Sequence, residues 1–383
     1  MKNVASIIFP AYERALSGKV LLFKSLNDWV TSACLSAGVD EVVLRDDENG
    51  LKNALNSKHI FAVSSRTPLI SKELIEEAYV LHITSQFPIT ALCSSEDEEI
   101  TAAFIRADIL SSEDFEAPFV EAMLEGLDAK GYKSGIYVAD EGMELFSIHN
   151  ARDLYLANEA ARTAVINSHL ENGVVLMCDS GIIISPDCEI GEGTVILPGT
   201  IIRNASKIGE GCTIGPNSLI DNSVIKDNCI INSTQITESS VDEGTTIGPF
   251  TQLRPNSHIG KNVKIGDFVE VKNSTIGDRT SVAHLTYVGD SDVGRKVNFG
   301  CGTVTVNYDG KNKFRTTIGD YAFIGCNSNL IAPVKIGDNA FTAAGSTVVN
   351  DVPDDSLYIS REKDEKVIEG WVEKKLGHRR WED

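Results

Sequence analysis

The sequence predicts two domains of different class, an α/β domain at the amino end and an all-β parallel β-helix built from hexapeptide repeats. The first observation is a run of isoleucines six residues apart, at Ile190, Ile196, Ile202, Ile208, Ile214 and Ile220. That spacing fits neither an α-helix nor an ordinary strand, but it fits a coil of three strand-and-turn units. The second observation is that short apolar runs alternate with helix-like segments before residue 148, which is typical of a parallel sheet covered by helices.

Residues 1–150 form the expected α/β domain. Its predicted strands are SIIF, EVVLR, HIFAVSS and ITALCS, and its predicted helices are LNDWVTSACLSAG, LKNALN and SKELIEEAYVLHI. Residues 151–172 have helical composition and spacing, which predicts a linker helix. The coil is expected over residues 173–360, and the charged residues 361–383 are expected to form a largely solvated tail.

The repeat continues beyond Ile220 with two shifts of one residue. Its later aliphatic positions are Ile247, Leu253, Ile259, Ile265, Val271, Ile276, Val282, Val293, Phe299, Ile318, Ile324, Leu330, Ile336 and Val348. Glycine often follows these positions, and Asn or Asp is frequent at the corners, as tight turns require. The six-residue register lapses between Phe299 and Ile318 in TVTVNYDGKNKFRT, where turn-forming residues predict an extruded hairpin or loop.

Composition narrows the classes of partner. The 383 residues carry a formal charge of −20, which argues against nucleic acid and anionic membranes as partners. A small anionic substrate remains possible if basic residues are concentrated locally. The sequence has neither a membrane-spanning apolar run nor the layout of a signal peptide, so a cytoplasmic protein is expected. Its eight scattered cysteines predict no disulfide and no metal site.

Several motifs in the coil are specific. In order they read LRPNS, GDFVEVK, AHLTYVGD, VNFGCGTVTVNYDGKNKFRT, IAP, TAAGSTV and ISR. They closely resemble the acetyltransferase half of the family of bifunctional N-acetylglucosamine-1-phosphate uridyltransferases and glucosamine-1-phosphate N-acetyltransferases, from about Ile247 to Trp371. The resemblance implies a left-handed β-helix, a homotrimer with active sites where protomers meet, and acetyl-CoA as acyl donor.

The implied reaction needs a base to accept a proton from the attacking amine. His284, within AHLTYVGD, is the expected base, because an unperturbed imidazole is largely neutral at cytosolic pH. By resemblance, Asn307 matches a polar residue close to the acetyl group, and Glu270 is expected to orient the imidazole. An exposed turn carboxylate explains Glu270 equally well.

The remaining site residues are also assigned by resemblance. Arg254, Lys272 and Lys313 match positions that bind phosphate and sugar, which suits cationic side chains, and Tyr287 and Asn298 match sugar contacts. The positions matching acetyl-CoA contacts are Cys301, Asn307, Tyr308, Cys326, Ala344 and Arg361. Cys301 or Cys326 could in principle take the acetyl group itself, but direct transfer to the amine is the expected mechanism.

The amino-terminal region departs from the family. The family's first strand is followed by a glycine-rich phosphate-binding loop, whereas this chain has IIFPAYERALSGKVL. Pro10 lacks an N–H and Glu13 would repel phosphate. Arg66 stands in the place of a metal-binding aspartate, although Asn150 and Arg152 match a late metal-site motif. The expectation is a degenerate nucleotidyltransferase-like domain, with no need for Mg²⁺ unless that domain is active.

Three alternatives stay open. The chain could retain both activities, with uridylyl transfer from UTP in the amino-terminal domain. It could be a non-enzymatic hexapeptide scaffold. It could also be a zinc hydratase on the same coil, but that site needs three imidazoles, and the coil offers only His258 and His284.

Overall fold

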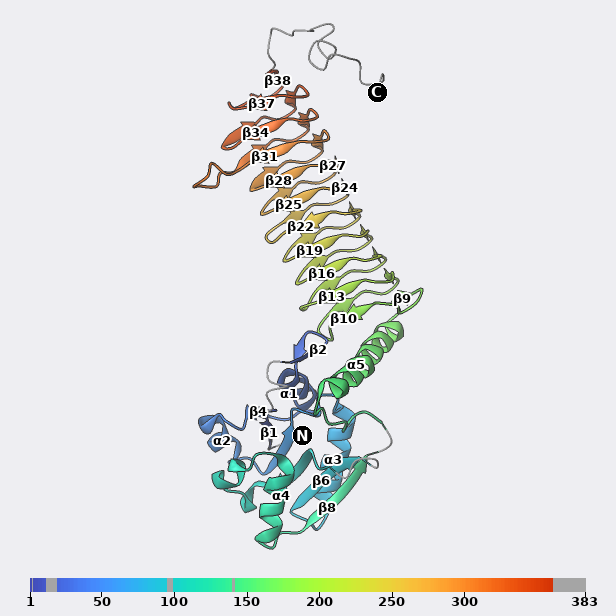
Figure 1. The fold of residues 1–383 in the computed structure, drawn as a ribbon, viewed down its shortest axis with the longest axis vertical. Coiled ribbons are helices and arrows are strands. Elements are labelled where there is room, and N and C mark those ends of the chain that lie inside the picture. Colours follow the sequence, from blue (N-terminus) through green and yellow to red (C-terminus); the bar gives the residue numbers. More distant parts are fainter. Residues whose placement is uncertain (2, 12–18, 95–98, 140–141, 361–383) are drawn as a thin grey trace, which may run out of the picture. The chain divides into compact units, whose positions relative to one another are not determined.

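The computed structural model describes residues 1, 3–11, 19–94, 99–139 and 142–360, and the chain divides into two compact units (Figure 1). The first unit consists of residues 1–172 with the short segments 183–188 and 202–204, and the second contains the rest of the coil. Arg361 and the tail lie outside the described residues. None of the helices in the described ranges is long and apolar enough to cross a membrane.

The first unit is built around a six-stranded sheet with the order β4-β1-β5-β7-β6-β8. The strands are β1 (Val4–Phe9), β4 (Glu41–Leu44), β5 (His59–Ser64), β6 (Ile89–Ser94), β7 (Ala102–Arg106) and β8 (Ser134–Ala139). Neighbouring strands are parallel except at β7, which runs antiparallel to both β5 and β6. The fully parallel sheet suggested by the sequence is therefore corrected at this one strand. A separate hairpin pairs β2 (Val20–Leu21) with β3 (Lys24–Ser25).

Helices cover this sheet. They are α1 (Leu26–Ser36), α2 (Glu48–Ala54), α3 (Lys72–Thr84) and α4 (Val120–Ala129), with short 3₁₀ turns η1 (Ala107–Ile109) and η2 (Ser112–Glu116). The fifth helix, α5 (Ala151–Glu171), packs instead in a separate cluster with Leu21, Leu22 and Leu26. Side chains of Ser25, Asp47, Ser71 and Asn150 accept hydrogen bonds from the first backbone N–H groups of α1, α2, α3 and α5. These groups have no partner within the helix, so each cap fixes where its helix begins. The helix expected over 151–172 is confirmed.

The sheet is buried on both faces. Along β1, Ile7 packs in a cluster with residues of α2 and α4, whereas Ile8 packs in a second cluster with residues of α1 and α3. Because successive side chains of a strand point to opposite faces, a strand between two helical layers is apolar along nearly all of its length. This explains the sequence VASIIF of β1, in which every residue is buried and the one polar side chain, Ser6, donates to Phe61 O at 3.1 Å.

The second unit is a coil whose strands form three parallel sheets. The ten-strand sheet contains β10 (Ile183–Ile184), β13 (Ile201–Arg203), β16 (Leu219–Asp221), β19 (Gln235–Thr237), β22 (Gln252–Leu253), β25 (Glu270–Lys272), β28 (Tyr287–Gly289), β31 (Val304–Val306), β34 (Asn329–Ile331) and β37 (Thr347–Val348). The nine-strand sheet contains β11 (Glu189–Ile190), β14 (Lys207–Ile208), β17 (Val224–Ile225), β20 (Ser240–Val241), β23 (His258–Ile259), β26 (Thr275–Ile276), β29 (Ser291–Val293), β32 (Thr316–Ile318) and β35 (Val334–Ile336).

The eleven-strand sheet completes the coil. It contains β9 (Val175–Leu176), β12 (Val195–Ile196), β15 (Thr213–Ile214), β18 (Ile230–Ile231), β21 (Thr246–Ile247), β24 (Lys264–Asp267), β27 (Ser281–His284), β30 (Asn298–Phe299), β33 (Phe323–Ile324), β36 (Phe341–Thr342) and β38 (Leu357–Tyr358). The repeated aliphatic residues are buried in all three sheets. This confirms the fold class expected from the sequence, an α/β domain followed by a parallel β-helix of the left-handed, hexapeptide-repeat class.

The lapse in the repeat is a hairpin, as predicted. Residues 307–315 leave the coil between β31 and β32, and an antiparallel bridge joins Tyr308 to Lys313 (Figure 1). Phe314 N donates to Asn307 O at 2.9 Å. At the tip, Asp309 Oδ1 accepts from the backbone N–H groups of Lys311 and Asn312 at 2.7 and 2.6 Å, which is an Asx turn that fixes the reversal.

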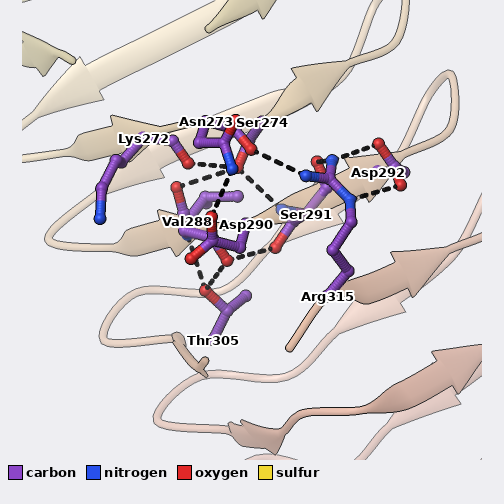
Figure 2. A network of polar contacts seen from close by, with 10 residues as sticks. Lys272, Asn273, Ser274, Val288, Asp290, Ser291, Asp292, Thr305 and Arg315 are labelled. Carbon is purple, nitrogen blue, oxygen red and sulfur yellow. Dashed lines mark hydrogen bonds and ion pairs between the residues drawn. The ribbon is translucent and has the colours of Figure 1, made fainter. Parts of the chain in front are cut away.

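A buried carboxylate holds the base of this hairpin (Figure 2). Asp290 is 5% exposed. Its carboxylate accepts from Asn273 Nδ2 at 2.5 Å and from Asn307 Nδ2. Burial by itself would raise the pKa of Asp290, but hydrogen bonds from the two amides and the charges of Lys272 and Lys313 outweigh it, so the pKa is lowered.

Arg315 closes the other side of the hairpin. Its guanidinium forms two hydrogen bonds with the carboxylate of Asp292, at 2.9 and 2.5 Å. It also donates to the backbone carbonyls of Asn273 and Ser291, at 3.2 and 3.1 Å (Figure 2). A planar guanidinium can make these bonds at once, so the returning strand is tied to two earlier coils.

The substitution Asp290→Asn should loosen the hairpin. The amides of Asn273 and Asn307 would lose a charged acceptor, which is expected to cost about 1–3 kcal/mol of local stability. Hydrogen–deuterium exchange across residues 304–316 should become faster. The matched control is Glu189→Gln, which removes only an exposed ion pair with Lys207. Equal exchange in wild type and Asp290→Asn would contradict this role.

The buried His82 predicts acid sensitivity of the first unit. It is 3% exposed, and its Nε2 lies 3.1 Å from His59 Nδ1. Burial, followed by the charges of His59 and Arg106, lowers the pKa of His82 from 6.5 to about 4. The unfolded chain therefore binds more protons between these values, and stability is lost as the pH falls from 6.5 towards 4.

This loss is expected to approach about 3 kcal/mol near pH 4 and to be about 2 kcal/mol between pH 7 and pH 5. It can be measured by urea denaturation at pH 7 and pH 5, followed by the helical circular dichroism signal, because α1–α5 all lie in residues 1–172. The variant His82→Gln should lose much less stability between the two pH values, while His258→Gln, an exposed residue of the coil, should behave as wild type. An identical pH dependence in His82→Gln would refute the assignment.

Candidate active site

One row of side chains runs along the corner between the eleven-strand and ten-strand sheets. Asp267 and His284 are direct partners in the pairing of β24 with β27. On both sides of this corner, each strand pairs with the strand of the next coil at the same difference in residue number. The row therefore continues from His284 to Cys301, Cys326 and Ala344. We call Asp267, His284, Cys301, Cys326 and Ala344 the corner row. Successive members are about 4.8 Å apart along the coil, as neighbouring strands of a sheet are.

His284 is accessible and oriented. Its side chain is 61% exposed, and Nδ1 lies 2.8 Å from Asp267 Oδ1. The hydrogen bond from His284 lowers the pKa of Asp267, which keeps the carboxylate ionised and able only to accept. Nδ1 must therefore donate, so that Nε2 of the neutral ring carries the free lone pair and faces outward as a possible base.

The role expected of Glu270 is wrong. Glu270 Oε1 lies 2.8 Å from Arg254 Nη1, and the carboxylate beside the imidazole belongs to Asp267. Glu270 lies on β25 of the ten-strand sheet, whereas Asp267 and His284 share the corner row. Asp267 was not among the predicted site residues, although one coil before His284, counted with the one-residue shift of the repeat, falls on this residue.

Close stacking at this corner requires a glycine. A Cβ on Gly266 would lie 1.9 Å from the carbonyl oxygen of Ala283, so no other residue fits without moving the backbone. The two coils can therefore approach closely just before Asp267 and His284. That approach brings the carboxylate into hydrogen-bonding distance of the imidazole.

Cationic side chains gather on the ten-strand sheet and the hairpin. Arg254 follows β22 and, by the register of β22 with β25, lies one coil before Lys272. Lys313 comes from the hairpin, and its direct side-chain contact with Lys272 is the largest cause of the lowered pKa of Lys272. Burial and the charges of Lys313 and Arg254 add to this lowering. We call Arg254, Lys272 and Lys313 the cationic cluster. Its mutual repulsion would be relieved by a bound anion, and it satisfies the local concentration of charge required for an anionic substrate.

Tyr287 connects this cluster with the polar core of the hairpin. Its register partner on β25 is Glu270. Its hydroxyl lies 3.5 Å from Asn307 Nδ2, and a Cβ on Gly289 would lie 2.3 Å from the same hydroxyl. The absence of a side chain at Gly289 thus leaves room for the ring. Asn307 itself is buried with its amide directed at Asp290.

Two of the predicted site residues, Asn298 and Tyr308, are not brought into this group within one chain. Asn298 is exposed on β30, where it pairs with Ser281 and Phe323. Tyr308 is exposed on the hairpin and donates its hydroxyl to Gly310 O at 2.7 Å. Arg361 lies outside the described residues.

In the first unit, Arg66 occupies the position at which the sequence lacks the expected metal-binding aspartate. Arg66 Nη1 lies 3.5 Å from His149 Nδ1, and His149 Nε2 lies 2.9 Å from Glu99 Oε2. The amide oxygen of Asn150 accepts from the N–H groups of Arg152 and Asp153 as the cap of α5. Asn150 therefore has a structural use here, and the described residues contain no cluster of three acidic, Cys or His side chains suited to a metal.

Comparison with known proteins agrees with the motifs. The family model described as bacterial transferase hexapeptide (six repeats) matches residues 187–222, 238–273 and 315–350. The bifunctional protein GlmU of Acetivibrio thermocellus is 48% identical over 252 residues, which are 66% of this chain and 54% of that protein. The bifunctional protein GlmU of Clostridium botulinum is 51% identical over 232 residues, which are 61% of this chain and 50% of that protein.

The chain spans about half the length of the curated relatives that it matches. Among solved structures, an Arabidopsis UDP-N-acetylglucosamine acyltransferase aligns with a TM-score of 0.36 and 19% identity over 53% of this chain and 77% of that one, too low a score to add to the fold described above. The identity to the curated proteins is high over two thirds of this chain, and the repeats lie in its coil. The chain is therefore a relative of the bifunctional GlmU proteins that carries bacterial transferase hexapeptide repeats.

Proposed function

We propose that this chain is an acetyl-CoA-dependent N-acetyltransferase that converts glucosamine 1-phosphate to N-acetylglucosamine 1-phosphate. The observation that carries the proposal is the imidazole of His284, hydrogen-bonded through Nδ1 to Asp267, on a coil that also presents the cationic cluster. The high identity to bifunctional GlmU proteins supports it. The product, N-acetylglucosamine 1-phosphate, would serve the synthesis of cell-wall precursors in the cytoplasm.

The reaction is a single acyl transfer. The amine nitrogen attacks the thioester carbonyl, and Nε2 of His284 takes the proton that the nitrogen loses. The C–S bond then breaks, and the thiol of CoA leaves with a proton returned by the imidazolium. Asp267 stabilises the imidazolium and holds the ring in one orientation. Direct transfer requires no acetylated Cys301 or Cys326.

The substrates occupy different surfaces in this proposal. The phosphate of the sugar is bound by the cationic cluster, because two lysines and an arginine compensate its charge. Acetyl-CoA lies along the corner row, where small side chains at Cys301, Cys326 and Ala344 permit close approach. Asn298, Tyr308 and Arg361 would complete the site of a neighbouring protomer in a homotrimer, which accounts for the separation of Asn298 and Tyr308 from the group within one chain.

The amino-terminal domain is proposed to have lost uridylyl transfer. A guanidinium at Arg66 opposes binding of Mg²⁺, and the amide of Asn150 caps α5. Purified protein incubated with UTP, N-acetylglucosamine 1-phosphate and Mg²⁺ should release no pyrophosphate above background. Robust release would show that the chain keeps both activities and that this part of the proposal is wrong.

Acetyl transfer can be tested with three variants. His284→Ala removes the proposed base, and Asp267→Asn and Glu270→Gln each neutralise one carboxylate. Thiol release from acetyl-CoA, with glucosamine 1-phosphate as acceptor, should fall about 10²- to 10⁴-fold in kcat for His284→Ala. Asp267→Asn should lower kcat to a smaller extent and leave KM for the sugar phosphate nearly unchanged. Glu270→Gln should instead mainly change that KM, because Glu270 pairs with Arg254. Wild-type kcat in His284→Ala would end the assignment.

A further inference from the structure

Two free thiols occupy neighbouring positions of the corner row. Cys301 and Cys326 are both exposed and unpaired. The strand pairs on both sides of them have the same offset, Asn298 with Phe323 and Val304 with Asn329. Asn327 N also donates to Cys301 O at 2.8 Å, so the register continues around the corner and Cys326 lies directly against Cys301.

This placement gives the two cysteines the Cα spacing of a disulfide. Neighbouring strands are about 4.8 Å apart, within the range of about 4.4–6.8 Å between Cα atoms that a disulfide spans. Side chains at equivalent positions of stacked coils leave the backbone in the same direction, and both of these are open to solvent. A Cβ on Gly300 would lie 2.4 Å from Cys326 N, so the coils are tightly stacked just before Cys301.

We propose that Cys301 and Cys326 form a vicinal dithiol that peroxides oxidise to a disulfide across two successive coils. One thiolate attacks a peroxide oxygen, becomes a sulfenic acid and releases water or an alcohol. The second thiolate then attacks that sulfur, the S–S bond forms, and the hydroxyl leaves as water. Two thiols lose two electrons and two protons, and the peroxide takes them up.

The position gives this oxidation a consequence. Both thiols share the corner row with His284 and Ala344, so the disulfide would alter the surface on which acetyl-CoA lies and stop acetyl transfer until it is reduced; this step rests on the proposed function. The other cysteines of the described residues offer no such pair at the surface, because Cys34, Cys188, Cys212 and Cys229 are buried and Cys93, which is half-buried, lies on β6 of the first unit. Cys178 is exposed at the start of the coil and serves as a control.

The first test measures proximity without any assay of activity. Phenylarsine oxide bonds two neighbouring thiols through one arsenic and releases water. Reduced wild type and Cys178→Ala should each bind one arsenical at the pair, and Cys301→Ala and Cys326→Ala should not. After hydrogen peroxide, peptide mapping without reductant should find Cys301 joined to Cys326 within one chain, with a mass lower by two hydrogens. A pair that binds no arsenical, or that yields only sulfinic acid or links between chains, overturns the proposal.

The second test measures the consequence. Peroxide should remove most acetyl transfer from wild type and from Cys178→Ala, and dithiothreitol should restore it. Cys301→Ala and Cys326→Ala, each compared with its own rate before oxidation, should resist. Loss of rate in these two variants equal to that of wild type contradicts the regulatory role. A mapped disulfide in a protein that has no acetyl transfer when reduced supports the dithiol and refutes the proposed function.

Discussion

The parallel register of the coil is the constraint on which its functional surfaces depend. Each strand is only two to four residues long, but it is hydrogen-bonded to its counterparts in the coils before and after it. Buried aliphatic side chains fill the interior of every coil, and a shift of one residue would expose them. Outward-facing residues are therefore stacked in rows about 4.8 Å apart. Chemistry is assembled here by placing the right residue at one position of successive repeats.

Two corners of the same coils show how different such rows can be. At one corner, Asp267 and His284 form an exposed pair in which the carboxylate fixes the imidazole. At the other, Asn273, Asp290 and Asn307 form a buried polar row that holds the hairpin. The first leaves a nitrogen lone pair facing outward, and the second satisfies its polar atoms internally, as a buried network must. The ten-strand sheet between them carries Tyr287 and Lys272, so the imidazole and cationic side chains lie on the same few coils.

Much of this could be predicted from the sequence, and the errors have physical reasons. The six-residue period identified the inward side chains, and the loss of that period located the hairpin. The period does not state which outward residues touch, because a carboxylate three positions away in the chain can lie on another sheet. Glu270 was therefore assigned to the imidazole that Asp267 contacts. The direction of β7 was missed because alternation of strands and helices does not reveal a short antiparallel strand.

We propose that the corner row binds the acyl donor while the neighbouring sheet and hairpin bind the sugar phosphate. A crystal structure of the protein with acetyl-CoA and glucosamine 1-phosphate would decide this. The thioester is expected beside Nε2 of His284, the donor extended past Cys301, Cys326 and Ala344, and the phosphate among Arg254, Lys272 and Lys313. A donor bound away from this row, with His284 in contact with neither ligand, would contradict it.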